Sequence, residues 1–137
     1  METLTVYIDG ASKGNPGKAS IGIVIYSEKK LIKKYGVPIG NATNNSAEYM
    51  ALITALIDCL SYCPADLEIK SDSQLLVKQM QKEYKVRDEG LQKLQFIASR
   101  LISRYNSVAF THIPREENRE ADKAANQYME AGQKQLF

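Results

Sequence analysis

The sequence predicts an α/β fold of five strands and four helices in the order βββαβααβα. Five segments are rich in β-branched and other apolar residues, as strands are. Four segments place apolar residues at helical spacing. Helical segments separate the third, fourth and fifth strands, which is typical of crossover connections between strands of one sheet.

The first three strands are expected at residues 4–9, 20–26 and 31–39. The glycine-containing segment 10–17 should be a loop, and Glu28–Lys30 should turn the second strand into the third. The second and third strands then form a hairpin, so that the first and third run in the same direction.

After a loop at residues 40–45, the chain continues with a helix at Ser46–Tyr62, which is apolar on most faces and is ended by Pro64. The remaining elements, in chain order, are a strand at 67–71, helices at 73–82 and 91–105, a strand at 108–113 and a helix from 118 to about 131. A right-handed crossover makes the fourth strand parallel to the first.

Composition predicts a single domain over residues 1–137, with 44% apolar residues and a net charge of +2. This charge permits nucleic-acid binding without predicting it. We expect a cytoplasmic protein with no membrane span and no signal peptide. Cys59 and Cys63 should be buried, reduced thiols. Together with the single His112, they are too few for a structural zinc site.

Four carboxylates stand at corresponding ends of these elements. Asp9 ends the first strand, Asp72 follows the fourth, Glu48 lies in the first turn of the first long helix and Asp122 lies near the start of the last. Ligands of such sheets bind outside the carboxyl ends of parallel strands. Because clustered like charges repel, a fold that keeps them there requires cations. The pattern predicts a divalent-metal site, typical of enzymes that cut or transfer phosphodiesters.

Each acid alone also has an ordinary interpretation. Asp9 could be a turn residue, Asp72 a helix N-cap, and Glu48 the last residue of a capping box at residues 45–48. Asp122 could be a solvated helix acid. Their coincidence at one end of the fold favours the metal site.

Four sequence blocks resemble type I ribonuclease H, in the same order and with similar spacing: Tyr7–Gly17, Thr43–Glu48, Ser71–Gln74 and Asn118–Asp122. The resemblance implies an RNase H-like fold, a five-stranded mixed sheet flanked by helices. It also implies an endoribonuclease that hydrolyses the RNA strand of an RNA–DNA hybrid, leaving 3′-hydroxyl and 5′-phosphate ends. We expect the chain to be a monomer.

On the matching positions, the resemblance makes Asp9, Glu48, Asp72 and Asp122 the ligands of two Mg²⁺ ions, with Mn²⁺ as a substitute. Carboxylate oxygens are the hard ligands that Mg²⁺ prefers. A metal pair can activate water and stabilise the leaving oxygen.

The resemblance also implies substrate-binding roles for Asn15, Thr43, Asn44, Asn45 and Gln74. We expect Gly10, Ser73 and Arg115 to bind substrate as well. The short amides among them suit hydrogen bonds to ribose 2′-hydroxyls in the minor groove, and Thr43 matches a position near a DNA phosphate. Each is equally an ordinary loop or cap residue.

His112 stands ten positions before Asp122, where the family has a mobile catalytic histidine that assists proton transfer or product release. The alternative is a strand-end histidine with a structural hydrogen bond. Pro114 stiffens the segment that follows, and we expect Arg115 to share the role or to bind a phosphate.

The chain departs from many relatives in lacking a basic helical handle, since residues 81–91 run almost directly into the next helix. The lysines and arginine nearby form only a small patch: Lys78, Lys82, Lys85 and Arg87. We expect weaker hybrid binding and a higher KM than in relatives with a handle. The alternatives are a non-catalytic nucleic-acid-binding relative, a nuclease or transposase-like member acting on other duplexes, and a scaffold without activity.

Overall fold

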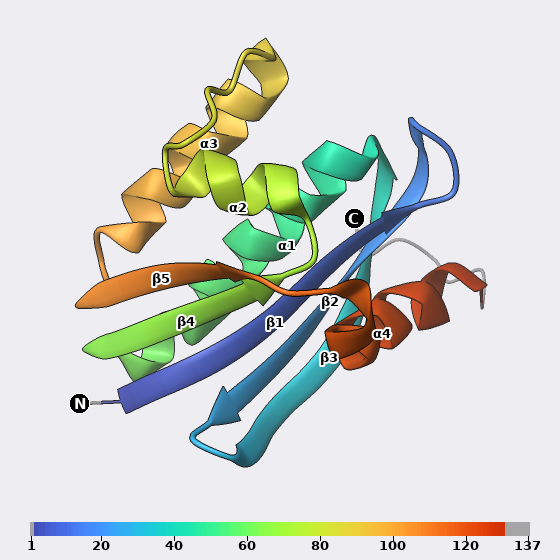
Figure 1. Ribbon diagram of the computed structural model, residues 1–137. Helices are drawn as coiled ribbons and strands as arrows, with labels where there is room; N and C mark the ends of the chain where they lie inside the picture. Colours follow the sequence, from blue (N-terminus) through green and yellow to red (C-terminus); the bar gives the residue numbers. More distant parts are fainter. Residues whose placement is uncertain (1, 131–137) are drawn as a thin grey trace.

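The computed structural model describes residues 2–130, whose five strands form one mixed sheet in the order β3-β2-β1-β4-β5 (Figure 1). The strands are β1 (Glu2–Ser12), β2 (Gly17–Ser27), β3 (Lys30–Ala42), β4 (Ala65–Ser71) and β5 (Ser107–His112). β2 pairs antiparallel with β1 and β3, whereas β4 pairs parallel with β1 and β5. The predicted fold class and element order are confirmed.

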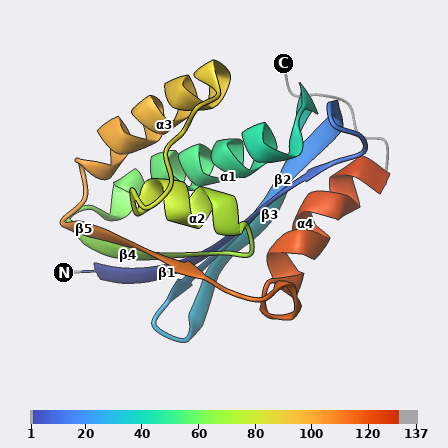
Figure 2. The same cartoon turned by 45° about the horizontal axis from the view of Figure 1, so that its top comes forward.

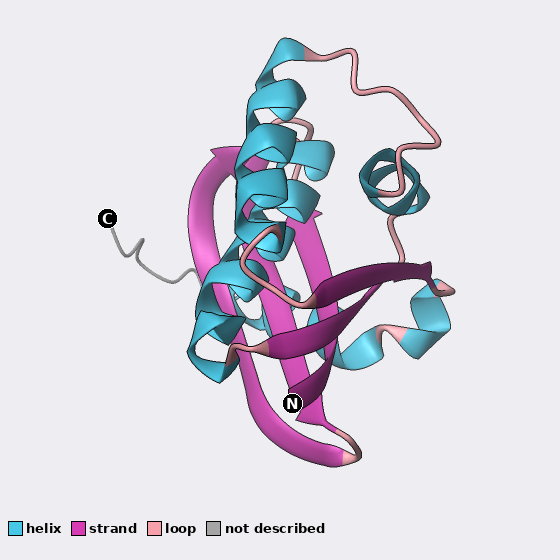
Figure 3. Ribbon diagram, turned by 90° about the vertical axis from the view of Figure 1, so that its left-hand side faces the viewer, coloured by secondary structure: helices cyan, strands magenta, loops and turns pink. Residues whose placement is uncertain are grey.

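Four α-helices and two 3₁₀ turns cover the sheet: α1 (Asn44–Asp58), η1 (Cys59–Tyr62), α2 (Gln74–Met80), α3 (Glu89–Ile102), η2 (Arg115–Glu117) and α4 (Arg119–Glu130). The first three α-helices lie on one face and α4 on the other (Figures 2 and 3). α1 packs on β1 and β2, and α3 packs on α1. Within residues 2–130, no helix is long and apolar enough to cross a membrane.

Two predicted loops are shorter than expected. Residues 10–12 continue β1 and residues 40–42 continue β3, because pairing to β2 extends to Ser12↔Ala19 and Gly17↔Ala42. Lys30 likewise belongs to β3 rather than to the turn. The composition of residues 10–12 and 40–42 is typical of loops, but hydrogen bonds to β2 hold these residues in strands. The predicted end of the last helix, Ala131, lies outside the described residues.

Both helices beside the acids begin at hydroxyl caps that the sequence analysis did not assign. Thr43 Oγ1 accepts the Ser46 N–H at 3.1 Å, so α1 already includes residues 44 and 45, and the capping-box interpretation of Glu48 is wrong. Ser73 Oγ accepts the Leu76 N–H at 3.2 Å, so Asp72 is not the cap of α2. Both carboxylates are therefore free of capping roles.

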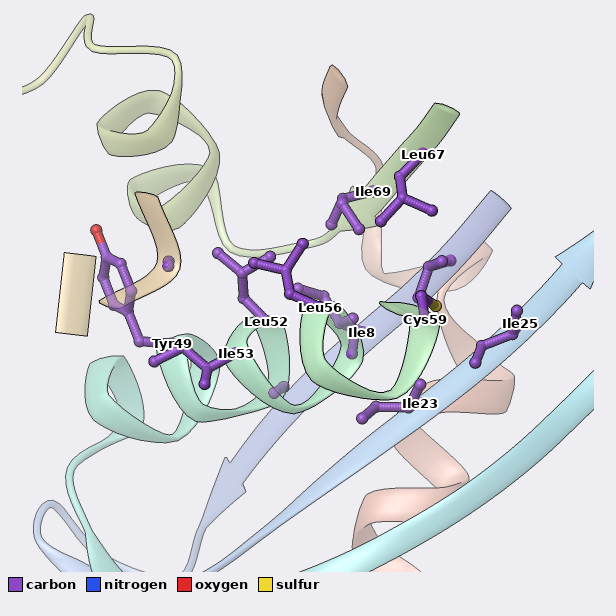
Figure 4. Packing of buried hydrophobic residues seen from close by; sticks show 14 of the residues in the cluster. Ile8, Ile23, Ile25, Tyr49, Leu52, Ile53, Leu56, Cys59, Leu67 and Ile69 are labelled. Carbon is purple, nitrogen blue, oxygen red and sulfur yellow. The ribbon is translucent and has the colours of Figure 1, made fainter. Parts of the chain in front are cut away.

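The hydrophobic core lies between α1 and the sheet (Figure 4). Strand alternation turns Leu4, Val6 and Ile8 of β1 toward it, and all three are fully buried. Cys59 is also buried there, whereas Cys63 is only partly buried because it follows the 3₁₀ turn η1. The expectation that both thiols are buried is thus correct for Cys59 alone.

Two glycines let helices approach the strand ends closely. A Cβ on Gly22 would lie 2.0 Å from the Ala121 carbonyl oxygen of α4. One on Gly10 would lie 2.5 Å from the Glu48 backbone nitrogen of α1. The absence of a side chain at both positions seats α1 and α4 directly against β1 and β2, beside the predicted acids.

Candidate active site

Three of the four predicted acids meet at the carboxyl ends of β1 and β4. Asp9, Glu48 and Asp72 each offer a carboxylate oxygen, and these oxygens lie within 4.8 Å of one another. Asp9 is buried, whereas the other two are partly exposed. Such a spacing is suited to shared coordination of a cation.

Strand alternation explains why Asp9 points away from the core. Ile8 faces α1, so Asp9 and its cross-strand partner Gly22 face α4. Glu48 reaches the same place from the start of α1, where its Oε1 accepts the Gly10 N–H at 2.9 Å. The same glycine that admits the helix therefore also holds its carboxylate.

Asp122 joins the cluster from the first turn of α4. Its side chain helps to raise the pKa of Asp9, and its Oδ1 accepts from Asn126 Nδ2 at 3.0 Å. All four acids line one open cavity of about 450 Å³. The structure thus brings together every carboxylate that the topology placed at this end of the sheet.

Burial and mutual repulsion raise the pKa values of two of these acids strongly. The pKa of Asp9 rises from 3.8 to about 9, chiefly through burial and then through the charges of Glu48 and Asp72. The pKa of Glu48 rises to about 8 through burial and the Asp72 charge, against the opposing effect of the Gly10 N–H. Near neutral pH, the cluster retains protons unless other positive charge replaces them.

Asp72 lies in a more balanced environment. Burial raises its pKa, while a hydrogen bond from Asn118 and the charges of Arg115 and His112 lower it. Asn118 is itself buried, and its Nδ2 donates to the Ile8 carbonyl at 2.9 Å. This residue therefore ties the start of α4 to the end of β1, a role that the sequence analysis did not assign.

The cavity contains some of the predicted substrate residues and adds others. Gly10, Asn44 and Arg115 line it, as expected for residues near a reacting group. Four further lining residues were not predicted as site residues: Ala11, Ser12, Lys13 and Asn126. Ala11, Ser12 and Lys13 belong to a segment that was expected to be a loop, with only Gly10 and Asn15 at the site. Asn126 could have been found from the sequence, because it lies four residues after Asp122 on the same face of a helix.

The other predicted substrate residues are not among those that line the cavity. Thr43 and Ser73 cap helices, while Asn45 and Gln74 are exposed at the starts of the same helices. Asn15 Oδ1 accepts the Asn44 N–H at 2.9 Å and so joins the hairpin loop to α1.

His112 is exposed at the end of β5, where it pairs with Ser71 of β4, and it is not part of the cavity lining. Arg115, three residues later in η2, lines the cavity instead. Of the two residues predicted to assist turnover, the arginine is therefore the one that lies at the cavity.

Comparison with known proteins gives a consistent family assignment. The family described as reverse transcriptase-like matches residues 7–128. The chain is 39% identical over 125 residues to "Ribonuclease HI" of Halobacterium salinarum, covering 90% of this chain and 63% of that protein. It is 35% identical to "Bifunctional protein Rv2228c" of Mycobacterium tuberculosis, covering 93% of this chain and 36% of that protein. The chain thus spans less than two thirds of these curated relatives.

Solved structures show the same fold. The RNase H1 of Halobacterium salinarum superposes with a TM-score of 0.91 at 38% identity, covering 94% of this chain and 98% of that chain. LC11-RNase H1, solved in complex with an RNA/DNA hybrid, superposes with a TM-score of 0.90 at 37% identity, covering 94% and 98%. The chain therefore belongs to the reverse transcriptase-like family, as a short ribonuclease H-like member whose α2 and α3 are joined by residues 81–88 alone.

Proposed function

We propose that this chain is a divalent-metal-dependent endoribonuclease that hydrolyses the RNA strand of RNA–DNA hybrids. The products would carry 3′-hydroxyl and 5′-phosphate ends, and catalysis would use two metal ions. The observation that carries the proposal is the set of three carboxylates within 4.8 Å of one another in a cavity that Asp122 also lines. The hybrid bound to the related LC11-RNase H1 supports the choice of substrate.

The chemistry of the cluster fits a pair of Mg²⁺ or Mn²⁺ ions. Its donors are carboxylate oxygens, and the raised pKa values of Asp9 and Glu48 show that positive charge is favoured among them. Asp9, Glu48, Asp72 and Asp122 would hold the ions. When bound, the ions would supply the charge that lowers the pKa of the attacking water and offsets charge developing on the phosphate.

The neighbouring residues of the chain fix the orientation of these acids. The Gly10 N–H holds Glu48, Asn126 holds Asp122, and Asn118, anchored on the Ile8 carbonyl, lowers the pKa of Asp72. Residues that are held in this way need little rearrangement when substrate binds. Arg115, at the cavity, would bind a substrate phosphate through its planar guanidinium.

The exposed amides near the helix starts would read the minor groove of the hybrid. The side-chain oxygen of Asn15 accepts the Asn44 N–H, and the side-chain NH₂ group of Asn15 would donate to a ribose 2′-hydroxyl. Asn45 and Gln74 are exposed on the same end of the molecule. His112, exposed at the end of β5, would assist proton transfer or product release.

The short α2–α3 connection supports weak hybrid binding. Of the basic residues near it, Lys78 is already paired with Glu83 at 3.2 Å, so the available patch is smaller than the sequence suggests. We propose a higher KM than in relatives with a handle. A salt dependence as steep as theirs would argue against this. A monomeric state and a cytoplasmic location stay predictions.

The test is cleavage of an RNA–DNA hybrid labelled at the RNA end, with RNA–RNA and DNA–DNA duplexes of the same sequence as controls. Each duplex is incubated with Mg²⁺, with Mn²⁺ and with EDTA. The proposal predicts metal-dependent cutting of only the RNA strand of the hybrid, with 5′-phosphate products. Binding without cutting under either metal would instead indicate a non-catalytic nucleic-acid-binding protein.

A further inference from the structure

Two basic side chains from distant parts of the chain line the acidic cavity. Lys13 follows β1 in the loop that leads into β2, whereas Arg115 follows β5 in η2. Arg115 already has a proposed role, but Lys13 has none.

The backbone at Lys13 is held in a defined conformation. Its N–H donates to the Lys18 carbonyl at 2.8 Å, and the preceding Ser12 hydroxyl lies 2.9 Å from the Ala42 carbonyl oxygen. Gly17 allows close packing, because a Cβ there would lie 2.7 Å from the Lys13 carbonyl oxygen. The base of the lysine side chain is thus fixed before any ligand arrives.

The Lys13 charge has no ion-pair partner among residues 2–130. Within residues 2–130, the ion pairs join Lys34 to Glu120 and Lys78 to Glu83, and neither involves Lys13. The residue is exposed although it borders a cavity lined by four acids. Its ammonium group is therefore available to an anion that enters the cavity.

We propose that Lys13 binds a backbone phosphate of the nucleic-acid substrate at the cavity that it lines. The inference rests on the proposed function, since it assumes a phosphodiester substrate. An ammonium group on a flexible stem suits a backbone contact that carries no sequence information. Lys13 and Arg115 line the same cavity as the carboxylates, so both would hold the polynucleotide beside the bond to be cut. Lys13 thereby supplies part of the backbone charge that a handle would contribute.

The test compares Lys13→Ala and Lys13→Arg with a matched control, Lys29→Ala. Lys29 is an exposed lysine in the β2–β3 turn at the opposite end of the sheet (Figure 1). Hybrid affinity is measured by fluorescence anisotropy in EDTA over a range of NaCl concentrations, and kcat and KM are measured with Mg²⁺. Circular dichroism melting confirms that all variants fold.

For Lys13→Ala we expect about fivefold weaker binding and a salt slope, log K against log[NaCl], that is smaller by about 1. KM should rise by a similar factor, while kcat stays within about twofold. Lys13→Arg should keep most of the wild-type affinity, and Lys29→Ala should behave as wild type.

Equal affinity and salt slope for Lys13→Ala and Lys29→Ala would overturn the inference and leave the proposed function intact if wild type cuts the hybrid. A loss of kcat at unchanged KM would also overturn it. If wild type binds the hybrid without cutting it, the proposed function fails and the salt slopes still decide the role of Lys13. A wild-type protein that does not bind the hybrid overturns both.

Discussion

At the scale of single residues, the site depends on polar groups that are buried against each other. Asp9 lies between Glu48, Asp72 and Asp122, with its pKa raised to about 9. The Gly10 N–H and the Asn118 amide stabilise neighbouring carboxylates, but neither carries a full charge. The protein alone therefore leaves the cluster short of positive charge, and this shortage is what a cation would correct.

Asp9→Asn removes the acid that is most strongly coupled to the others. We expect turnover to fall well beyond the roughly 10–100-fold that is typical for loss of a residue supporting a metal ligand. The metal-free variant should be more stable than wild type at pH 8, by at least about 1 kcal/mol, because asparagine is neutral and need not take up a proton on folding, as Asp9 must. Urea unfolding in EDTA measures the second effect, and a variant less stable than wild type would contradict it.

Asn118→Ala removes the amide that bridges α4 and β1. The Ile8 carbonyl would lose its side-chain donor in a buried position, so we expect the free energy of unfolding to fall by about 1–3 kcal/mol. Asn41→Ala is the control: Asn41 is exposed on β3, and its replacement should change stability by less than about 0.5 kcal/mol. Equal effects of the two substitutions in urea unfolding would show that the Asn118 bridge contributes nothing to stability.

At the scale of the elements, the site is built where helices meet strands without intervening side chains. Gly10 admits the start of α1 and Gly22 admits α4, while Thr43 and Ser73 set where α1 and α2 begin. These contacts place Glu48 and Asp122 relative to Asp9. The elements themselves were predictable from apolar patterns, but the close approaches join residues about 38 to 100 positions apart and leave no local signal.

Gly22→Ala should displace α4 from the sheet. The new Cβ would meet the Ala121 carbonyl oxygen at 2.0 Å and the Ala125 nitrogen at 2.7 Å, and backbone atoms cannot move aside as a flexible side chain can. We expect the free energy of unfolding to fall by about 3 kcal/mol or more. Activity should also fall, because Asp122 moves with the helix.

Gly90→Ala is the matched control for this change. Its Cβ would meet only a side-chain oxygen of Asp88, at 3.2 Å, and alanine favours the helix in which it lies. Its stability should be equal to or higher than that of wild type. Thermal melts in which Gly22→Ala unfolds at the same temperature as Gly90→Ala would contradict the close-packing account.

At the scale of the whole molecule, one mixed sheet gathers acids from four separate parts of the chain at one end. The order of strands and helices sufficed to predict this gathering, because parallel strands end together and the helices that follow them begin there. The sequence did not predict that Ser12 and Lys13 reach the cavity. Their segment has the composition of a loop, and only its pairing to β2 places it at the end of a strand.

The charge cluster should make the stability of the metal-free protein depend on pH. Asp9 and Glu48 have pKa values of about 9 and about 8 in the folded state, above their values of 3.8 and 4.5 when unperturbed. The folded state thus holds protons that the unfolded state releases. The stability that these groups contribute is complete below about pH 4 and is lost as pH rises through 8 and 9.

Urea unfolding in EDTA at pH 5, 7 and 9 measures this trend. We expect the urea midpoint of the wild-type protein to fall as pH rises, and that of Asp9→Asn to fall less. At pH 8, replacing EDTA with Mg²⁺ or Mn²⁺ should raise the wild-type midpoint again. A wild-type midpoint that does not fall between pH 5 and pH 9, or that does not respond to either ion, would argue against a cation site in the cluster.

The central claim is that the carboxylate cluster performs metal-dependent hydrolysis of the RNA strand in a hybrid. The most direct measurement is single-turnover cleavage of an end-labelled hybrid by wild type and Asp9→Asn, each with Mg²⁺ and with EDTA. We expect RNA cleavage by wild type with Mg²⁺ and none above background in the other three reactions. Cleavage that persists in EDTA, or that Asp9→Asn performs at the wild-type rate, would contradict it.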